Sequence, residues 1–203
     1  MPAGTGSADH VRRGSVGELE RAERLIEARL SRSLVEHSRR VAATAASLAR
    51  RWGGDEALAG DAAVAGTLHD YCRELSPEET LAEARRLGVS IGPLEERRPV
   101  QLLHAPLAAA EVAAFGFADR VLRAIARHTV GAPGMTLLED SVYVADAIEP
   151  GRTFAGVDAL RAAASGSPDE AVAACVREGL ASLIAQQKPL HPSSVALYNE
   201  LHG

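Results

Sequence analysis

A histidine and an aspartate, His69 and Asp70, stand side by side where an apolar segment meets a polar one, in the stretch GTLHDYCREL. Both side chains are common metal ligands. Adjacent residues on a helix point about 100° apart, so His69 can bind one metal ion while the carboxylate of Asp70 reaches between two. The pair predicts a two-metal centre built from one helix end.

Further histidines and a second aspartate lie on the inner faces or at the ends of expected helices. His37 shares its apolar face with Val41 and Ala45, at helical steps. Apolar neighbours place three more candidates in the same way: His104, His128 and Asp146. A lone histidine there is usually a hydrogen-bonded core residue. Burying a carboxylate costs several kcal/mol unless it is paired or binds a metal, so one shared metal site is simpler than six separate partners.

The types of these ligands indicate which metals suit the site. Neutral imidazole nitrogen with carboxylate oxygen suits iron, manganese, zinc or cobalt. A structural zinc site built from thiolates is not indicated, because the two cysteines, Cys72 and Cys175, are far apart and form no CxxC spacing. We therefore expect one or two ions from this group of metals.

Helical periodicity dominates the chain and strand alternation is nearly absent. Helix starts are expected at capping residues: Asp55, Ser76 with Glu79, Asp119, and Thr136 with Glu139. Residues 88–99 are expected to form a loop, with Pro106 starting a helix just after His104. The other expected helices cover residues 17–30, 33–52, 158–164 and 168–187, and a short last helix ends at Leu201.

These elements predict an all-α fold: a single-domain helical bundle over residues 18–203, with the metal site between helices. Aromatic residues make up only 3%, so the core must consist mainly of Ala, Leu and Val, which favours closely packed helices. Residues 1–17 are polar and rich in glycine and serine, and we expect a disordered tail there.

Charge and hydropathy exclude several classes of partner. The formal net charge is -5, whereas a general nucleic-acid binder shows a basic excess. No apolar run approaches the roughly 20 residues that a membrane span needs, and the N-terminus lacks the apolar centre of a secretory signal. The chain is therefore expected to be cytoplasmic, without nucleic-acid or membrane partners.

The order H…HD…H…H…D, at residues 37, 69–70, 104, 128 and 146, resembles the HD-domain phosphohydrolase superfamily. The segments GTLHDYCREL, LLHAPLAA, AIARHTVGAPGMTLLEDSVYVADAIEPGRTFAGVDALR and HPSSVALYN resemble more narrowly the YqeK family. This family comprises bacterial symmetrical diadenosine tetraphosphate (Ap4A) hydrolases. The resemblance covers about residues 30 to 200 and is most specific from His128 to Arg161.

The resemblance implies a single HD-domain bundle that cleaves Ap4A into two ADP with metal-activated water at a di-metal site. The implied metal ligands are His37, His69, Asp70, His104, His128 and Asp146. The implied catalytic residues are Asp70, His104, His128 and Arg152. Nucleotide contacts are expected at Asp70, Tyr71, Cys72, Arg73, His104, His128, Thr129, Asp146, Arg152, Pro189, Leu190, His191, Pro192, Ser193 and Ser194. Iron is the metal expected first, with manganese, cobalt or zinc as alternatives, and a homodimer stays open.

Three positions depart from the family pattern. Arg73 replaces a usual lysine and keeps its charge with different reach and geometry. Leu34 stands where the family often has arginine, and Ser38 replaces a common threonine. These changes affect the positioning of phosphate and leave the metal ligands intact.

Two other functions stay open at this point. An HD-domain phosphohydrolase could act on another nucleotide, such as a nucleoside monophosphate. A metal-bound helical module could instead act through protein contacts without turnover. Product analysis with Ap4A separates these alternatives.

Overall fold

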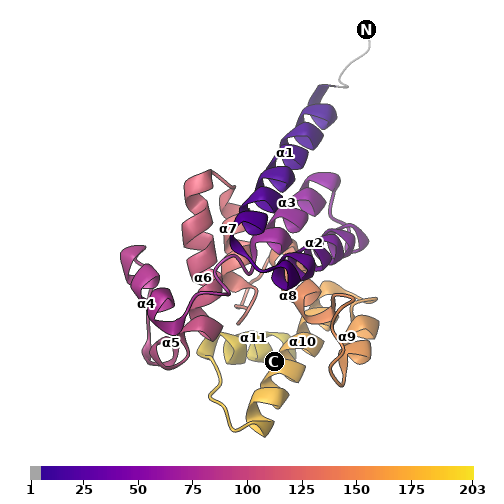
Figure 1. The fold of residues 1–203 in the computed structure, drawn as a ribbon. Coiled ribbons are helices and arrows are strands. Elements are labelled where there is room, and N and C mark those ends of the chain that lie inside the picture. The colour runs from indigo at the N-terminus through magenta and orange to yellow at the C-terminus, as the bar shows by residue number, and fades with distance from the viewer. Residues whose placement is uncertain (1–5) are drawn as a thin grey trace.

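The computed structural model describes residues 6–203, with side chains from residue 17 onward, and these residues form helices and no strand (Figure 1). The elements in chain order are α1 (Gly6–Arg29), α2 (Arg32–Arg51), α3 (Glu56–Leu68), α4 (Pro77–Arg86), α5 (Pro93–Arg97), α6 (Pro99–Val112), the 3-10 turn η1 (Ala113–Phe115), α7 (Asp119–Arg127), α8 (Leu137–Ile148), α9 (Val157–Ala163), α10 (Pro168–Ala185) and α11 (Pro192–His202). No described helix is both long enough and apolar enough to cross a membrane.

The centre of the bundle is formed by α2, α3, α7 and α8, which pack against one another. Helix α6 packs beside α7, α1 covers α3, and α9 and α10 pack on α8 (Figure 1). One hydrophobic core, mainly of Ala, Leu and Val, extends from Ala22 in α1 to Leu197 in α11. The expected all-α bundle is confirmed.

A glycine brings the two helices with the first ligands unusually close. A Cβ on Gly66 of α3 would lie 2.8 Å from Cα of Ala42 in α2, so no larger residue fits without moving a backbone. Because α3 lies this close to α2, the imidazoles of His37 and His69 meet at 3.3 Å between their Nε2 atoms.

Three of the four expected capping residues are confirmed. The side chain of Asp55 accepts a hydrogen bond from the Leu58 amide. Ser76 and Thr136 both complete capping boxes with a glutamate three residues later. The fourth expectation was wrong: Ala118 is the N-cap of α7, and Asp119 lies in the first turn without a side-chain cap. There its charge still favours the positive end of the helix dipole.

The region before His104 also differs from expectation. Part of the expected loop is the short helix α5, which starts at Pro93. Helix α6 begins at Pro99, so Pro106 lies inside it and His104 is a helical residue. The physical reason is that Pro99 occupies the first turn, where a missing N–H costs nothing.

The first helix starts earlier than the sequence suggested. Residues 1–5 of the expected disordered tail lie outside the described residues. From Gly6 onward the backbone is helical and continues without interruption to Arg29, since no proline stops it in this range.

Candidate metal centre

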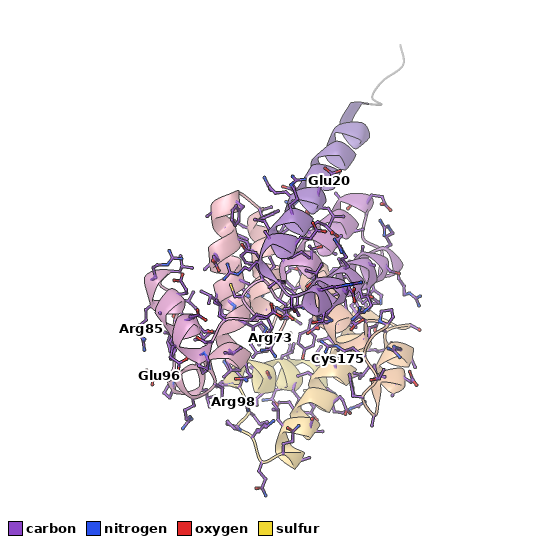
Figure 2. The ribbon with its side chains drawn as sticks, viewed as in Figure 1. Glu20, Arg73, Arg85, Glu96, Arg98 and Cys175 are labelled. Carbon is purple, nitrogen blue, oxygen red and sulfur yellow. The ribbon has the colours of Figure 1, made fainter. Side chains whose placement is uncertain are left out.

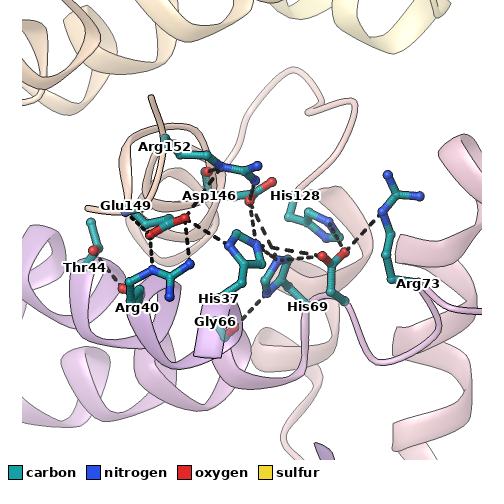
Figure 3. Close-up of polar contacts among 12 residues, drawn as sticks. His37, Arg40, Thr44, Gly66, His69, Arg73, His128, Asp146, Glu149 and Arg152 are labelled. Atoms are coloured by element: carbon teal, nitrogen blue, oxygen red, sulfur yellow. Dashed lines mark hydrogen bonds and ion pairs between the residues drawn. The ribbon is translucent and has the colours of Figure 1, made fainter. Parts of the chain in front are cut away.

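The six expected ligands meet in one buried cluster, although they come from four helices and from the residue pair after α3. Figure 3 labels four of them: His37, His69, His128 and Asp146. Helix α2 supplies His37, and the end of α3 supplies His69 and Asp70. The remaining three come from α6, the end of α7 and α8: His104, His128 and Asp146. Only Asp146 is partly exposed, and the other five are buried.

Asp70 divides the cluster, because its two oxygens face different groups. The first donor set consists of His37, His69 and Asp146 together with Asp70 Oδ2. In this set, Nε2 of His37 lies 3.2 Å from Asp146 Oδ1 and 3.8 Å from Asp70 Oδ2. Nε2 of His69 lies 3.4 Å from Asp70 Oδ2.

The second donor set consists of His104 and His128 together with Asp70 Oδ1. Nε2 of His104 lies 3.3 Å from Asp70 Oδ1 and 3.1 Å from Nε2 of His128. Nε2 of His128 lies 3.8 Å from the same oxygen. The two oxygens of Asp70 thus face separate histidine pairs, which is the arrangement that a bridging carboxylate requires.

Each histidine is oriented by a hydrogen bond from its other ring nitrogen. The Nδ1 atoms of His69, His104 and His128 donate to main-chain carbonyls of Gly66, Val100 and Ile125, at 2.7, 2.8 and 2.8 Å respectively. Nδ1 of His37 lies 3.2 Å from Glu149 Oε1. These contacts place the proton on Nδ1 and leave the four Nε2 lone pairs directed into the cluster.

Two imidazole lone pairs that face each other repel unless a metal ion or a proton lies between them. His37 and His69 present Nε2 atoms to each other at 3.3 Å, and His104 and His128 do so at 3.1 Å. A metal ion bound at about 2.0–2.2 Å from each ligand separates neighbouring ligand atoms by roughly 3–3.5 Å. Both donor sets therefore fit metal ions of the kind expected from the sequence.

The carboxylate that supports His37 is held in turn by other groups. Glu149 accepts hydrogen bonds from Arg40 Nε at 2.5 Å and from the Gly151 amide at 2.6 Å. These donors outweigh the effect of burial and lower the pKa of Glu149 to about 2. Glu149 is thus a fixed anion that orients the imidazole ring of His37 through its Nδ1 atom.

The cluster keeps its carboxylates charged. Burial alone would raise the pKa of Asp70, but the adjacent His69 and His104 hold it well below the ordinary value. Burial lowers the pKa of His69, and the Asp70 carboxylate outweighs it, which raises that pKa to about 9. Burial and the neighbouring histidine charges lower the pKa of His128 to about 3. Without metal, a proton on His69 takes the place of the cation, and metal binding must release it.

A cavity of about 860 Å³ opens beside the cluster. Among the expected site residues, those that line it are His37, Asp70, Arg73, His104, His128, Thr129, Asp146, Arg152, Pro189, His191 and Ser194. Its volume lies within the usual range of ligand sites, about 300–1,000 Å³. The cavity thus borders both donor sets and can hold a substrate larger than a mononucleotide.

Two arginines lie on opposite sides of the ligand cluster (Figure 3). Arg152 forms an ion pair with Asp146 and donates from Nε to the Asp146 carbonyl at 2.8 Å. Arg73 lies on the other side, with Nε 3.9 Å from Asp70 Oδ1. The hydroxyl of Thr129 lies 3.1 Å from Nε2 of both His104 and His128.

The loop before α11 and the first turn of that helix reach the cavity through three residues. Pro189, His191 and Ser194 line it. His191 caps α11, and its Nε2 lies 3.0 Å from Glu95 Oε1 of α5. Ser194 donates to the Val130 carbonyl at 2.7 Å. The other three expected residues of this segment do not line the cavity: Leu190, Pro192 and Ser193.

Two other expected contact residues, Tyr71 and Cys72, point away from the cavity. Both are buried in the core. Arg29 of α1 lies 4.4 Å above the Tyr71 ring, and the Cys72 thiol donates to Glu111 Oε2 at 2.9 Å. Their side chains therefore anchor the turn that carries Asp70 to α1 and α6.

Several cavity residues were not expected from the sequence. Arg98 and Gln101 line one wall, and Phe154 and Glu178 line another. These residues belong to no recognisable sequence motif with the ligand histidines, so sequence alone did not indicate them. Glu149 could be predicted as a partner of a ligand histidine, but its contact with Arg40 depends on the approach of α2 to α8.

Comparison with known proteins places this site in a family. The HD-domain family model matches residues 34–151. The chain is 36% identical to the symmetrical bis(5'-nucleosyl)-tetraphosphatase of Bacillus subtilis, over 81% of this chain and 87% of that protein. It is 33% identical to the protein of the same name from Halalkalibacterium halodurans, over 89% and 95%.

A solved structure agrees with these matches. The crystal structure of a predicted HD superfamily hydrolase involved in NAD metabolism, from Clostridium acetobutylicum, superposes with a TM-score of 0.83 at 31% identity. The match covers 90% of this chain and 96% of that one. The chain therefore belongs to the HD-domain family, in the branch that contains the symmetrical bis(5'-nucleosyl)-tetraphosphatases.

Proposed function

We propose that this protein hydrolyses Ap4A symmetrically and releases two ADP. The observation that carries the proposal is the position of Asp70, whose two oxygens each face a separate pair of histidines beside a cavity of about 860 Å³. The relatives named symmetrical bis(5'-nucleosyl)-tetraphosphatase support the same reaction.

The six ligands would hold two metal ions, with Asp70 shared between them. Such a pair lowers the pKa of water to near neutrality and neutralises charge on the phosphate. Iron is our first proposal, because mixed imidazole and carboxylate ligands suit it, and manganese, cobalt and zinc are the alternatives.

The chain's own residues orient the tetraphosphate. A guanidinium has five N–H donors, so Arg152 retains donors for phosphate oxygens after pairing with Asp146. Arg73 likewise offers N–H donors for phosphate oxygens, on the side of Asp70 Oδ1. Cleavage at the centre of the substrate requires the two halves to extend in different directions, and these arginines lie on opposite sides of the cluster (Figure 3).

The surroundings of the site support two further parts of the proposal. Both cysteines are unpaired and buried, as in a protein of the reducing cytoplasm. Thr129 is proposed to orient the leaving group or the phosphate, because its hydroxyl lies at the edge of the second donor set.

Product analysis tests the reaction. The protein is loaded with manganese, or with iron without oxygen, and incubated with Ap4A, and the nucleotides are separated by anion exchange. ADP as the sole product is expected. ATP with AMP would contradict the position of cleavage. Unchanged Ap4A with metal bound would favour another nucleotide or a module without turnover.

A further inference from the structure

One wall of the cavity is formed by the start of α6. It contains none of the metal ligands or phosphate-binding residues proposed above. Arg98, Gln101 and Leu102 line the cavity from this segment, and Leu94 joins them from α5. Arg98 is the N-cap residue of α6 and precedes the ligand His104 by six residues. At 1.5 Å per residue, the start of α6 at Pro99 lies about 7.5 Å from His104 along the helix axis.

Arg98 lacks a counter-charge within the part of the chain that the structure describes. Its side chain is half-buried and forms neither an ion pair nor a hydrogen bond there. One of the two acidic residues on α5, Glu95, is already paired with His191 at 3.0 Å. The other two arginines of the cavity each face an aspartate: Arg152 faces Asp146, and Arg73 faces Asp70.

A half-buried guanidinium without a partner favours binding of an anion, because desolvation of the charge is then compensated. Arginine recognises phosphate through two parallel N–H donors. Gln101 adds an amide that can both donate and accept, and Leu94 and Leu102 add apolar surface. Together these groups have the composition of a site for a phosphorylated nucleoside.

This wall lies on the side of the second donor set. His104 lies in α6, whose N-cap residue is Arg98. Arg73 approaches the Asp70 oxygen that faces His104. Arg152 lies across the cluster, next to the first donor set (Figure 3). Arg73, Arg98 and Cys175, which are labelled near the centre of Figure 2, all line the cavity.

We propose that Arg98 and Gln101 bind one ADP half of the dinucleotide, while the Arg152 side of the cavity binds the other half. The inference rests on the proposed function and adds the direction in which each half extends. Arg98 is a binding residue for one half and takes no part in the metal centre.

The test compares Arg98→Ala with Arg97→Ala, which removes a neighbouring exposed arginine that does not line the cavity. Arg98 makes no side-chain cap for α6, so its removal leaves the helix start intact. Calorimetry measures binding of ADP and of a non-hydrolysable Ap4A analogue with a methylene group at its centre. Metal content and melting temperature are recorded for every variant.

Arg98→Ala is expected to weaken binding of the analogue about tenfold or more, because a charge-assisted hydrogen bond to the analogue is lost. Binding of ADP should weaken less than twofold, because ADP can occupy the Arg152 side of the cavity instead. Arg97→Ala should match the parent protein, and Arg98→Lys should fall between. In turnover, the KM for Ap4A should rise while kcat changes less than threefold.

Two results would overturn the inference. Analogue binding by Arg98→Ala within twofold of the parent would show that no half of the substrate uses this wall. An equal loss for ADP and the analogue would indicate a general effect on the site. If the parent protein itself binds the analogue but releases no ADP from Ap4A, the proposed function fails separately.

Discussion

The two donor sets that share Asp70 are supported differently, although each contributes two histidines. The first set includes a second aspartate, Asp146, and its His37 contacts the carboxylate of Glu149. In the second set, the Nδ1 atoms of His104 and His128 donate only to main-chain carbonyls. Thr129 places a side-chain hydroxyl at its edge.

This difference predicts unequal metal affinity. A divalent cation in the first set is surrounded by more negative charge, and anionic support raises the basicity of a ligand histidine. The second set has the shared carboxylate alone. We therefore expect the first set to hold its metal more tightly and the second set to lose its metal first on dilution or chelation.

Removing the shared ligand should erase the difference and have the largest effect. Asp70→Ala deprives both sets of their carboxylate bridge. ADP formation should fall by more than the roughly 10–100-fold typical of losing a supporting group, and metal analysis should give less than one ion per chain.

The matched control for this change is Asp61→Ala, which removes another buried aspartate. Asp61 pairs with Arg120 and belongs to neither donor set. Its loss should lower the melting temperature while both metals stay bound. Retention of two ions by Asp70→Ala would contradict the bridging role.

Replacing one histidine in each donor set tests directly whether the two sets bind metal with different affinity. His104→Ala should retain about one tightly bound ion, because the first set is untouched. His37→Ala should lose the tight site, so that its remaining metal is removed by a weak chelator. Competition with a chromophoric chelator measures both. Equal loss from the two variants would show that the sets are equivalent.

Removing the anion behind His37 should have a smaller effect. Glu149→Gln keeps the size of the side chain and lowers metal affinity of the first set by about 10–100-fold. Glu139→Gln is the matched control, since Glu139 is buried and paired with Arg127 but contacts no ligand histidine. An unchanged affinity in Glu149→Gln would remove the charge argument for the first set.

The same glutamate should also make stability depend on pH in the metal-free protein. Its folded pKa of about 2 lies below its ordinary value of 4.5, chiefly because its donors outweigh burial. Its stabilisation, on the order of 1–3 kcal/mol, is therefore present above pH 4.5 and is lost as the pH falls toward 2. Urea unfolding should show the gap between parent and Glu149→Gln shrinking over this range. A gap independent of pH would contradict the assignment.

The smallest effect is expected at the edge of the second set. Thr129→Val removes the hydroxyl but retains the shape of the side chain, so one net hydrogen bond of about 0.5–1.5 kcal/mol is lost. Metal affinity should change by less than tenfold, and Thr129→Ser should behave like the parent. A larger loss would make Thr129 a ligand in its own right.

The ligand set could be predicted from sequence because it follows from helical spacing. His37 and Asp146 share helix faces with apolar residues, and His69–Asp70 ends an apolar segment. The division of the cluster between the two oxygens of Asp70 depends instead on tertiary packing, because His104 of α6 faces one oxygen and His69 faces the other. The contribution of Arg152 on the cavity wall was expected from resemblance alone.

Other features depend on contacts between distant segments and left no local signal. Helix α6 starts at Pro99, which makes Arg98 its N-cap residue, whereas Pro106 inside the helix had suggested a later start. Tyr71 and Cys72 adjoin the ligands in sequence, but the tight turn after α3 directs them toward Arg29 and Glu111. The anion behind His37 required α8 to lie against α2.

Stepwise addition of manganese to the metal-free enzyme, with ADP formation from Ap4A followed at each step, tests the unequal two-metal centre most directly. The first equivalent should fill the tighter set and give little turnover, and the rate should rise between the first and second equivalents. A rate that reaches its maximum at one ion per chain would contradict a centre in which both donor sets act together.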